Sequence, residues 1–185
     1  EFSDEEILQL EKVHQALAII QFKLENQLIK RRPEFQMQDH VMLDKIDYWE
    51  ESVTIDDTKH ALVNTCFQTI DPENPSALTP EENQAVDSML ASFQSSLKMA
   101  EHMSLLMNKG SMYKIYNQHL LFHGCIPLEP SGEFQPFILN QAHYAGKELL
   151  DFFEYHIRQA AKNKEVGDDL STDLIWYCWK GKLSP

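Results

Sequence analysis

The chain has 185 residues, about the length of one domain with a substantial core. Its 29 Asp and Glu against 16 Lys and Arg give a net charge of −13, which argues against binding nucleic acid or an anionic membrane, because both need clustered basic residues. No signal peptide opens the chain, and no apolar run approaches the ~18 residues that a membrane span needs. We therefore expect a soluble, cytoplasmic protein with no nucleic-acid or membrane partner.

The amino-terminal region is expected to be one long helix. Ser3 and Glu6 form a capping box, and the pattern continues to Arg32, before Pro33. One apolar stripe is expected to be covered by a partner, and its spacing is close to a heptad, which is typical of paired helices: Ile7, Leu10, Val13, Leu17, Ile20, Leu24 and Leu28. The basic run Lys30-Arg31-Arg32 fits a solvated helix end, and a phosphate clamp is the alternative.

The next segment is expected to hold a short helix and a hairpin. Residues 38–46 show helical spacing, and strands are predicted at 52–55 and 61–63. Asp56-Asp57 lies between these strands. We interpret the pair as turn residues rather than metal ligands, because adjacent residues on a turn rarely converge on one ion.

A second long helix is predicted from Pro80 to Lys109, with Thr79 as N-cap, Glu82 at the third position and Gly110 as C-cap. Its apolar stripe is expected to pack against that of the first helix; an adaptable Met-rich partner surface is the alternative. The stripe comprises Val86, Met89, Leu90, Phe93, Leu97, Ala100, Met103 and Met107.

The most strand-like stretch is residues 112–122, in which two runs flank Asn117-Gln118 and predict a β-hairpin. His123 follows at the end of a strand expected to be buried, and Gly124 permits a tight turn. An imidazole there suits a metal ligand or an acid–base group, and a packed strand-end histidine is the alternative. Lys109, Ser111 and Tyr113 could reach a phosphate, but we interpret them as structural residues.

The carboxyl-terminal part is expected to contain a turn at 130–133, a strand within 134–139, a helix over 144–162 and a short aromatic helix over 170–179. So many aromatic residues in a short helix need covering: in a longer chain we expect them to meet another part of the protein, and in an excised piece we expect them to be exposed and to cause self-association. Cys66, Cys125 and Cys178 are an odd, widely spaced set, and we expect buried free thiols in a reducing compartment.

Several motifs resemble those of known phosphatases. Phe122-His123-Gly124-Cys125-Ile126-Pro127 is similar to the His-Gly-Gly-Leu-Ser-Pro element of serine/threonine phosphatases, although Cys125 replaces a glycine. The chain also resembles the class 3 fructose-1,6-bisphosphatases of Firmicutes, a family of calcineurin-like metallophosphatases, in segments that span nearly its whole length: 18–25, 29–35, 109–113, 121–128, 176–179 and 183–185.

This resemblance implies hydrolysis of the 1-phosphate of fructose 1,6-bisphosphate, a gluconeogenic step that needs manganese. It implies that His123 is one ligand of a two-metal site. The family's Asp-x-His, Gly-Asp-x-x-Asp-Arg-Gly and Gly-Asn-His-Asp motifs do not occur in these residues. The chain is therefore expected to be an internal fragment, inactive in isolation, because one imidazole cannot hold manganese.

The expected fold is α+β and mostly helical, with long helices packed on each other and two small antiparallel hairpins, as part of a larger metallophosphoesterase. Residues 1–110 are predicted to form a helical region with a hairpin near 47–69, and residues 111–185 a phosphatase-core hairpin followed by helices. A non-enzymatic helical regulatory or oligomerisation module is the alternative function, and a homo-oligomer through exposed helices is compatible with both.

Overall fold

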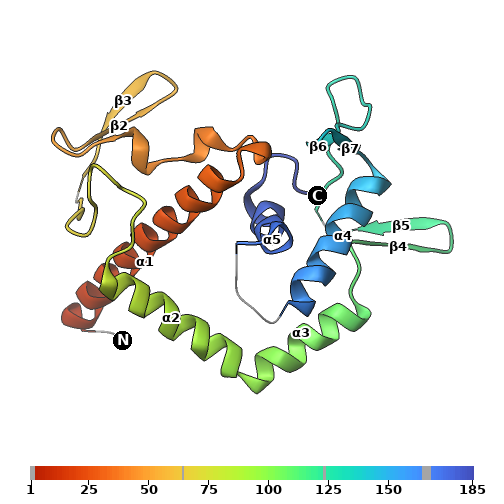
Figure 1. Cartoon of the computed structure of the whole chain (residues 1–185), viewed down its shortest axis with the longest axis horizontal. Helices are drawn as coiled ribbons and strands as arrows, with labels where there is room; N and C mark the ends of the chain where they lie inside the picture. Colours follow the sequence, from red (N-terminus) through yellow and green to blue (C-terminus); the bar gives the residue numbers. More distant parts are fainter. Residues whose placement is uncertain (1–2, 64, 123, 164–167) are drawn as a thin grey trace. The chain divides into compact units, whose positions relative to one another are not determined.

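The computed structural model describes residues 3–63, 65–122, 124–163 and 168–185. The fold is α+β, with five α-helices and short antiparallel strands in the described chain (Figure 1). It divides into two compact units, residues 1–91 and 92–185. The described strands form three small sheets rather than the two hairpins expected, with orders β1-β2-β3, β4-β5 and β6-β7.

Helix α1 spans Asp4–Arg31, and its predicted start is confirmed. Glu6 accepts a hydrogen bond from the Ser3 backbone N–H (2.8 Å), and the Glu6 N–H donates to Ser3 Oγ (3.3 Å). The expectation that the whole apolar stripe is covered is wrong for most of its length. Only Ile20 and Leu28 are buried, whereas the other five stripe residues are exposed: Ile7, Leu10, Val13, Leu17 and Leu24.

The core of the first unit forms where the end of α1 meets the following loops. Residues 38–46 do not form the predicted α-helix: Gln38–His40 and Leu43–Lys45 are separate 3-10 turns, after a first turn at Pro33–Phe35. A segment of nine residues is too short to sustain an α-helix on its own, because helix nucleation is costly. The turns instead let the irregular chain bury apolar side chains alongside those of α1 and β2: Ile29, Phe35, Met37, Val41, Leu43 and Val53.

The first sheet contains the predicted hairpin. Strands β2 (Ser52–Ile55) and β3 (Thr58–Ala61) are antiparallel, and β1 (Ile46–Asp47) adds a third strand to β2. Asp56 and Asp57 have φ values of 47° and 60°, as a tight two-residue hairpin turn requires. The turn interpretation of this acidic pair is therefore confirmed, and the second strand begins three residues earlier than predicted.

The predicted second long helix is two helices, α2 (Pro80–Ser95) and α3 (Leu97–Lys109). Ser96 separates the two helices, because a serine hydroxyl competes with the backbone hydrogen bonds of a helix. Its Oγ accepts from the Met99 N–H (3.3 Å) and so caps the start of α3. The start of α2 has the predicted capping box between Thr79 and Glu82.

The apolar stripe of α2 and α3 is not the core that the sequence predicted. Five of its eight residues are exposed and three are half-buried. The expectation that this stripe is buried is therefore wrong for most of its length, and its packing against the stripe of α1 stays a prediction. The alternative prediction, that this exposed stripe is a Met-rich surface for a partner, stays a prediction.

The second unit has an aromatic core. Strands β6 (Phe137–Leu139) and β7 (Ala142–Tyr144) pair, and α4 (Lys147–Lys162) and α5 (Leu170–Lys180) pack on each other. Tyr144 belongs to β7, so the predicted helix begins three residues later than expected. Phe137 lies 5.0 Å from the ring of Tyr177 and 5.7 Å from that of Phe153, between centroids. The predicted aromatic helix at 170–179 is confirmed, with Tyr177 buried and Trp179 exposed.

The three cysteines are free, as predicted, but the expectation that they are buried is wrong for two of them, and Cys178 is half-buried. Cys66 and Cys125 are exposed, whereas burial raises the pKa of Cys178 to about 12. Since only the thiolate reacts, we expect a disulfide reagent at about pH 8 to modify two thiols of the native chain and a third only after denaturation. Rapid labelling of Cys178 in a Cys66→Ser, Cys125→Ser variant would contradict this.

Candidate functional site

The candidate site begins with the predicted hairpin of residues 112–122. Strands β4 (Tyr113–Tyr116) and β5 (His119–Phe122) are antiparallel, with Tyr113 opposite Phe122. Asn117 and Gln118 have φ values of 47° and 61°, so the predicted two-residue turn is confirmed. The expectation of a buried strand is wrong: every residue of β5 is exposed, since a two-stranded ribbon leaves both faces open.

The predicted metal ligand, His123, directly follows β5 and lies outside the described residues. Its role therefore stays a prediction. The described residues before it, up to Phe122, and after it, from Gly124, show what the chain contacts on either side of this position.

The chain after the hairpin lies against the segment that follows α5. Gly124 has φ of 90°, and a Cβ atom there would lie 2.9 Å from the carbonyl of Pro185. Cys125 Sγ donates to the Ser184 carbonyl (3.4 Å), and the Leu183 N–H donates to Tyr177 Oη (3.2 Å). A side chain at position 124 would need both a left-handed backbone and movement of the opposing backbone, so glycine is required.

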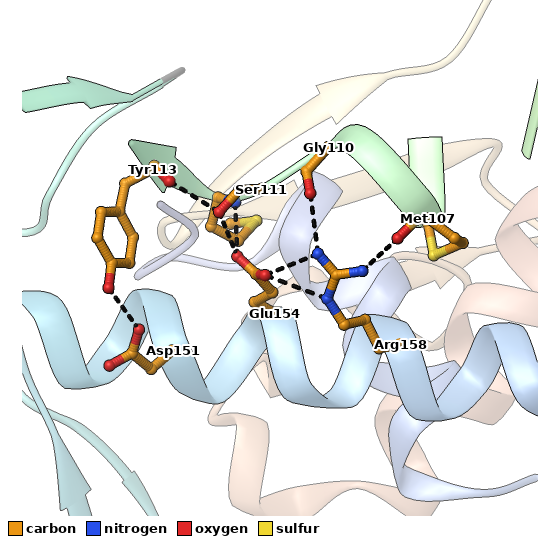
Figure 2. Close-up of polar contacts among 8 residues, drawn as sticks. Met107, Gly110, Ser111, Tyr113, Asp151, Glu154 and Arg158 are labelled. Carbon is orange, nitrogen blue, oxygen red and sulfur yellow. Dashed lines mark hydrogen bonds and ion pairs between the residues drawn. The ribbon is translucent and has the colours of Figure 1, made fainter. Parts of the chain in front are cut away.

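The chain before the hairpin is tied to α4 by Glu154 (Figure 2). Its carboxylate accepts from Ser111 Oγ (2.7 Å) and from the Met112 N–H (2.9 Å). Although burial opposes ionisation, these bonds and the guanidinium of Arg158 lower the pKa of Glu154. The carboxylate is thus ionised where β4 begins.

Arg158 joins the same cluster to the end of α3. Its guanidinium pairs with Glu154 (2.8 Å) and donates to the carbonyls of Met107 and Gly110, the latter at 2.8 Å (Figure 2). Such carbonyls at a helix end have no intrahelical partner, so a fork of N–H donors satisfies them well. One turn of α4 therefore fixes both the end of α3 and the origin of the hairpin.

A second contact holds β4 against α4. Tyr113 Oη donates to Asp151 Oδ1 (3.0 Å), and Lys147 pairs with Asp151 (2.5 Å) while lying 5.4 Å from the centre of the Tyr113 ring. The hydrogen bond from Lys147 lowers the pKa of Asp151. Ser111 and Tyr113 are thus engaged within the protein, which supports their structural interpretation over phosphate contact.

The basic run at the end of α1 is largely paired. Lys30 lies 2.8 Å from Asp44, and Arg32 lies 3.6 Å from Glu34. These ion pairs agree with a helix end whose cations are neutralised locally. They do not favour the alternative of a phosphate clamp.

A hydrogen bond joins helices α4 and α5, between His156 Nδ1 and Ser171 Oγ at 2.8 Å. Burial lowers the pKa of His156 below 6.5, against the opposing effect of Asp169. The folded chain therefore favours the neutral ring, and its unfolding free energy should decrease as the pH falls from about 6.5 through the lowered pKa. Urea unfolding between about pH 7.5 and 5.5 should show this loss, and His156→Gln should reduce it. An unchanged pH dependence in that variant would contradict the assignment.

The described residues do not provide a metal centre. Within the ranges 3–63, 65–122, 124–163 and 168–185, no three His, Cys, Asp or Glu side chains converge to hold an ion. Manganese needs several oxygen ligands, so the donor set in this part of the chain does not fit the ion by itself. The Glu154–Arg158 cluster was not predicted from the sequence, where its signal is an acidic and a basic residue four positions apart on a helix.

The whole chain, residues 1–185, matches the family described as Firmicute fructose-1,6-bisphosphatase. The chain belongs to this family. A protein of Streptococcus sanguinis named fructose-1,6-bisphosphatase class 3 is 97% identical over all 185 residues, which cover 29% of that relative. The relative of the same name from Streptococcus gordonii is 83% identical over the same shares of the two chains.

More distant members carry the same name. The Staphylococcus epidermidis relative is 51% identical over 176 residues, which are 95% of this chain and 27% of the relative. The chain thus spans less than a third of the curated relatives it matches. No solved structure matches it. Among the described residues, no helix is long and apolar enough to cross a membrane.

Proposed function

We propose that this chain is part of an enzyme that hydrolyses fructose 1,6-bisphosphate to fructose 6-phosphate and phosphate. The observation that carries the proposal is the 97% identity, over all 185 residues, to a relative named fructose-1,6-bisphosphatase class 3. The family match over the same residues supports it. The proposal includes a role in gluconeogenesis and a cytoplasmic location.

The enzyme uses manganese, with His123 as one ligand and the remaining ligands outside these 185 residues. The likeness of residues 122–127 to a phosphatase metal element supports this assignment. The described geometry contributes a hairpin whose origin is fixed on α4 by Glu154 and Arg158. The isolated chain is inactive and binds manganese weakly, which a calorimetric titration with the ion tests.

The test uses the full-length protein that contains this segment. Phosphate release from fructose 1,6-bisphosphate should be lost on chelation and restored by manganese. His123→Ala should abolish the activity and lower the manganese content, whereas His119→Ala, a control on the exposed face of the same hairpin, should change neither. Absence of release by the wild type would refute the substrate; full activity of His123→Ala would refute only the ligand assignment.

A second role is supported by the exposed stripes: the helices also assemble copies of the enzyme. The first four turns of α1 leave Ile7, Leu10, Val13 and Leu17 in solvent, and an isolated helix of that length is marginal in water. Light scattering on the full-length protein tests this role. An oligomer that dissociates on Leu10→Glu, Leu17→Glu substitution would support it, and a monomeric wild type would exclude it.

A further inference from the structure

The first unit contains an open surface hollow of about 680 Å³, within the size range of small-molecule sites. It is formed by the end of α1 at Lys30, by the chain from Leu43 to Trp49, and by the loop Pro72–Pro75. None of these residues belongs to the hairpin or to the cluster around Glu154. The hollow therefore shares no lining residue with the candidate site of the second unit.

Trp49 stands at this hollow with 92% of its surface exposed. Its indole has no hydrogen bond or ring contact with any described residue, although its backbone is held: Asp47 Oδ1 accepts from the N–H groups of Trp49 (3.0 Å) and Glu50 (2.9 Å). A fixed turn thus presents a large unpaired π-face. Tryptophan is the side chain that attracts cations most strongly through its ring face.

The charges of the residues that line the hollow also favour a cationic ligand. Both lysines are engaged, Lys30 with Asp44 (2.8 Å) and Lys45 with the carbonyl of Asp39. Three carboxylates line the hollow, at Asp44, Asp47 and Glu73. That of Glu73 has no partner among the described residues, and Asp47 is kept ionised because the N–H of Glu50, together with that of Trp49, lowers its pKa.

The unit as a whole adds a long-range attraction for cations. Residues 1–91 contain 19 Asp and Glu against 7 Lys and Arg, a net charge of −12, whereas residues 92–185 contain 10 against 9. Nearly all of the negative charge of the chain therefore lies in the unit that carries the hollow. A field of this sign concentrates cations and repels phosphates and other anions.

We propose that this hollow binds an organic cation, an alkylammonium or guanidinium group that stacks on Trp49 and pairs with Glu73. The group belongs to a free polyamine or to a basic side chain of a peptide, since both offer the same chemistry. The amide of Asn74, also in the lining, supplies a further acceptor.

The test is calorimetric titration of the full-length protein with spermidine and, separately, with the peptide Gly-Arg-Gly at low salt. At least one probe should bind, and Trp49→Ala should weaken it about five- to thirtyfold. Glu73→Gln should weaken it as well, and Trp49→Phe should retain part of the affinity. The matched control is Trp179→Ala, which removes an exposed tryptophan of the second unit and should change nothing.

The two probes distinguish the sources, because preference for spermidine indicates a free polyamine and preference for the peptide indicates a protein partner. Failure of both probes to bind would overturn the proposal. Equal affinity in Trp49→Ala would also overturn it, since binding would then be general attraction to an acidic surface. Tighter binding of inorganic phosphate or of sorbitol than of either cation would show that the ligand class is wrong.

Discussion

Replacing Lys23 by Ala is expected to lower the unfolding free energy of the chain by about 3–5 kcal/mol. Lys23 is fully buried on α1, where its Nζ lies 2.7 Å from Glu82 Oε2 and 2.5 Å from the carbonyl of Thr69. Removal of the ammonium leaves the Glu82 carboxylate buried without its cation. A buried unpaired charge costs far more than the pair contributes, so the loss is large.

The pairing also has a pH dependence of known sign. Burial raises the pKa of Glu82, but the hydrogen bond from Lys23 and that from the Thr79 N–H bring it below its usual value. The ion pair therefore stabilises the fold at pH values above the pKa that a glutamate has in the unfolded chain. This stabilisation is lost as the pH falls through the lowered pKa of the folded chain.

Urea unfolding followed by circular dichroism measures the effect. Lys12→Ala, an exposed lysine on the same helix, is the control and should stay within about 0.5 kcal/mol of the wild type. The double variant Lys23→Met, Glu82→Gln keeps the capping box and removes both charges, so it should recover much of the lost stability. If Lys23→Ala behaved like Lys12→Ala, the ion pair would have no structural role.

The elements that the sequence predicted well are those whose signals are local. Ser3 with Glu6 and Thr79 with Glu82 mark helix starts through hydrogen bonds three residues apart. Asp56-Asp57 and Asn117-Gln118 mark turns because these residue types tolerate positive φ. Such features need no knowledge of the rest of the chain.

The burial of the helical stripes was not predictable in the same way. Periodicity shows that one face of α1 is apolar, but whether Leu10 or Leu17 is buried depends on what covers that face. Lys23, a charged residue within the same helix, is more deeply buried than any leucine of the stripe, because Glu82 and Thr69 compensate its charge. Thr69 lies 46 positions and Glu82 lies 59 positions from Lys23 in the sequence, and a periodic pattern gives no information about contacts at such separations.

The candidate site shows the same limit. The hairpin and its turn were predicted, but the side chains that anchor its start, Glu154 and Arg158, lie 43 and 48 positions after their partners Ser111 and Gly110. A single Glu-to-Arg spacing of four is common on exposed helix faces and does not point to a distant strand. The anchoring could only be found once α3, β4 and α4 were placed together.

That anchoring predicts a local effect of Arg158→Ala. The guanidinium satisfies the carbonyls of Met107 and Gly110 and pairs with Glu154, so its removal leaves three acceptors without their donor. A cost of about 1.5–3 kcal/mol is expected for hydrogen bonds to a charged group. The loss should concentrate at the end of α3 and the start of β4, because Glu154 also holds Met112.

Hydrogen exchange resolves this prediction residue by residue. The amide of Met112 and those of β4 should exchange faster in Arg158→Ala, while amides of α5 keep their rates. Arg158→Lys should recover only part of the protection, since one ammonium cannot reach two carbonyls and a carboxylate in the planar geometry of a guanidinium. Lys162→Ala, an exposed residue of the same helix, is the control. Uniform acceleration across the second unit would mean that Arg158 stabilises the core in general and has no particular role in setting the origin of the hairpin.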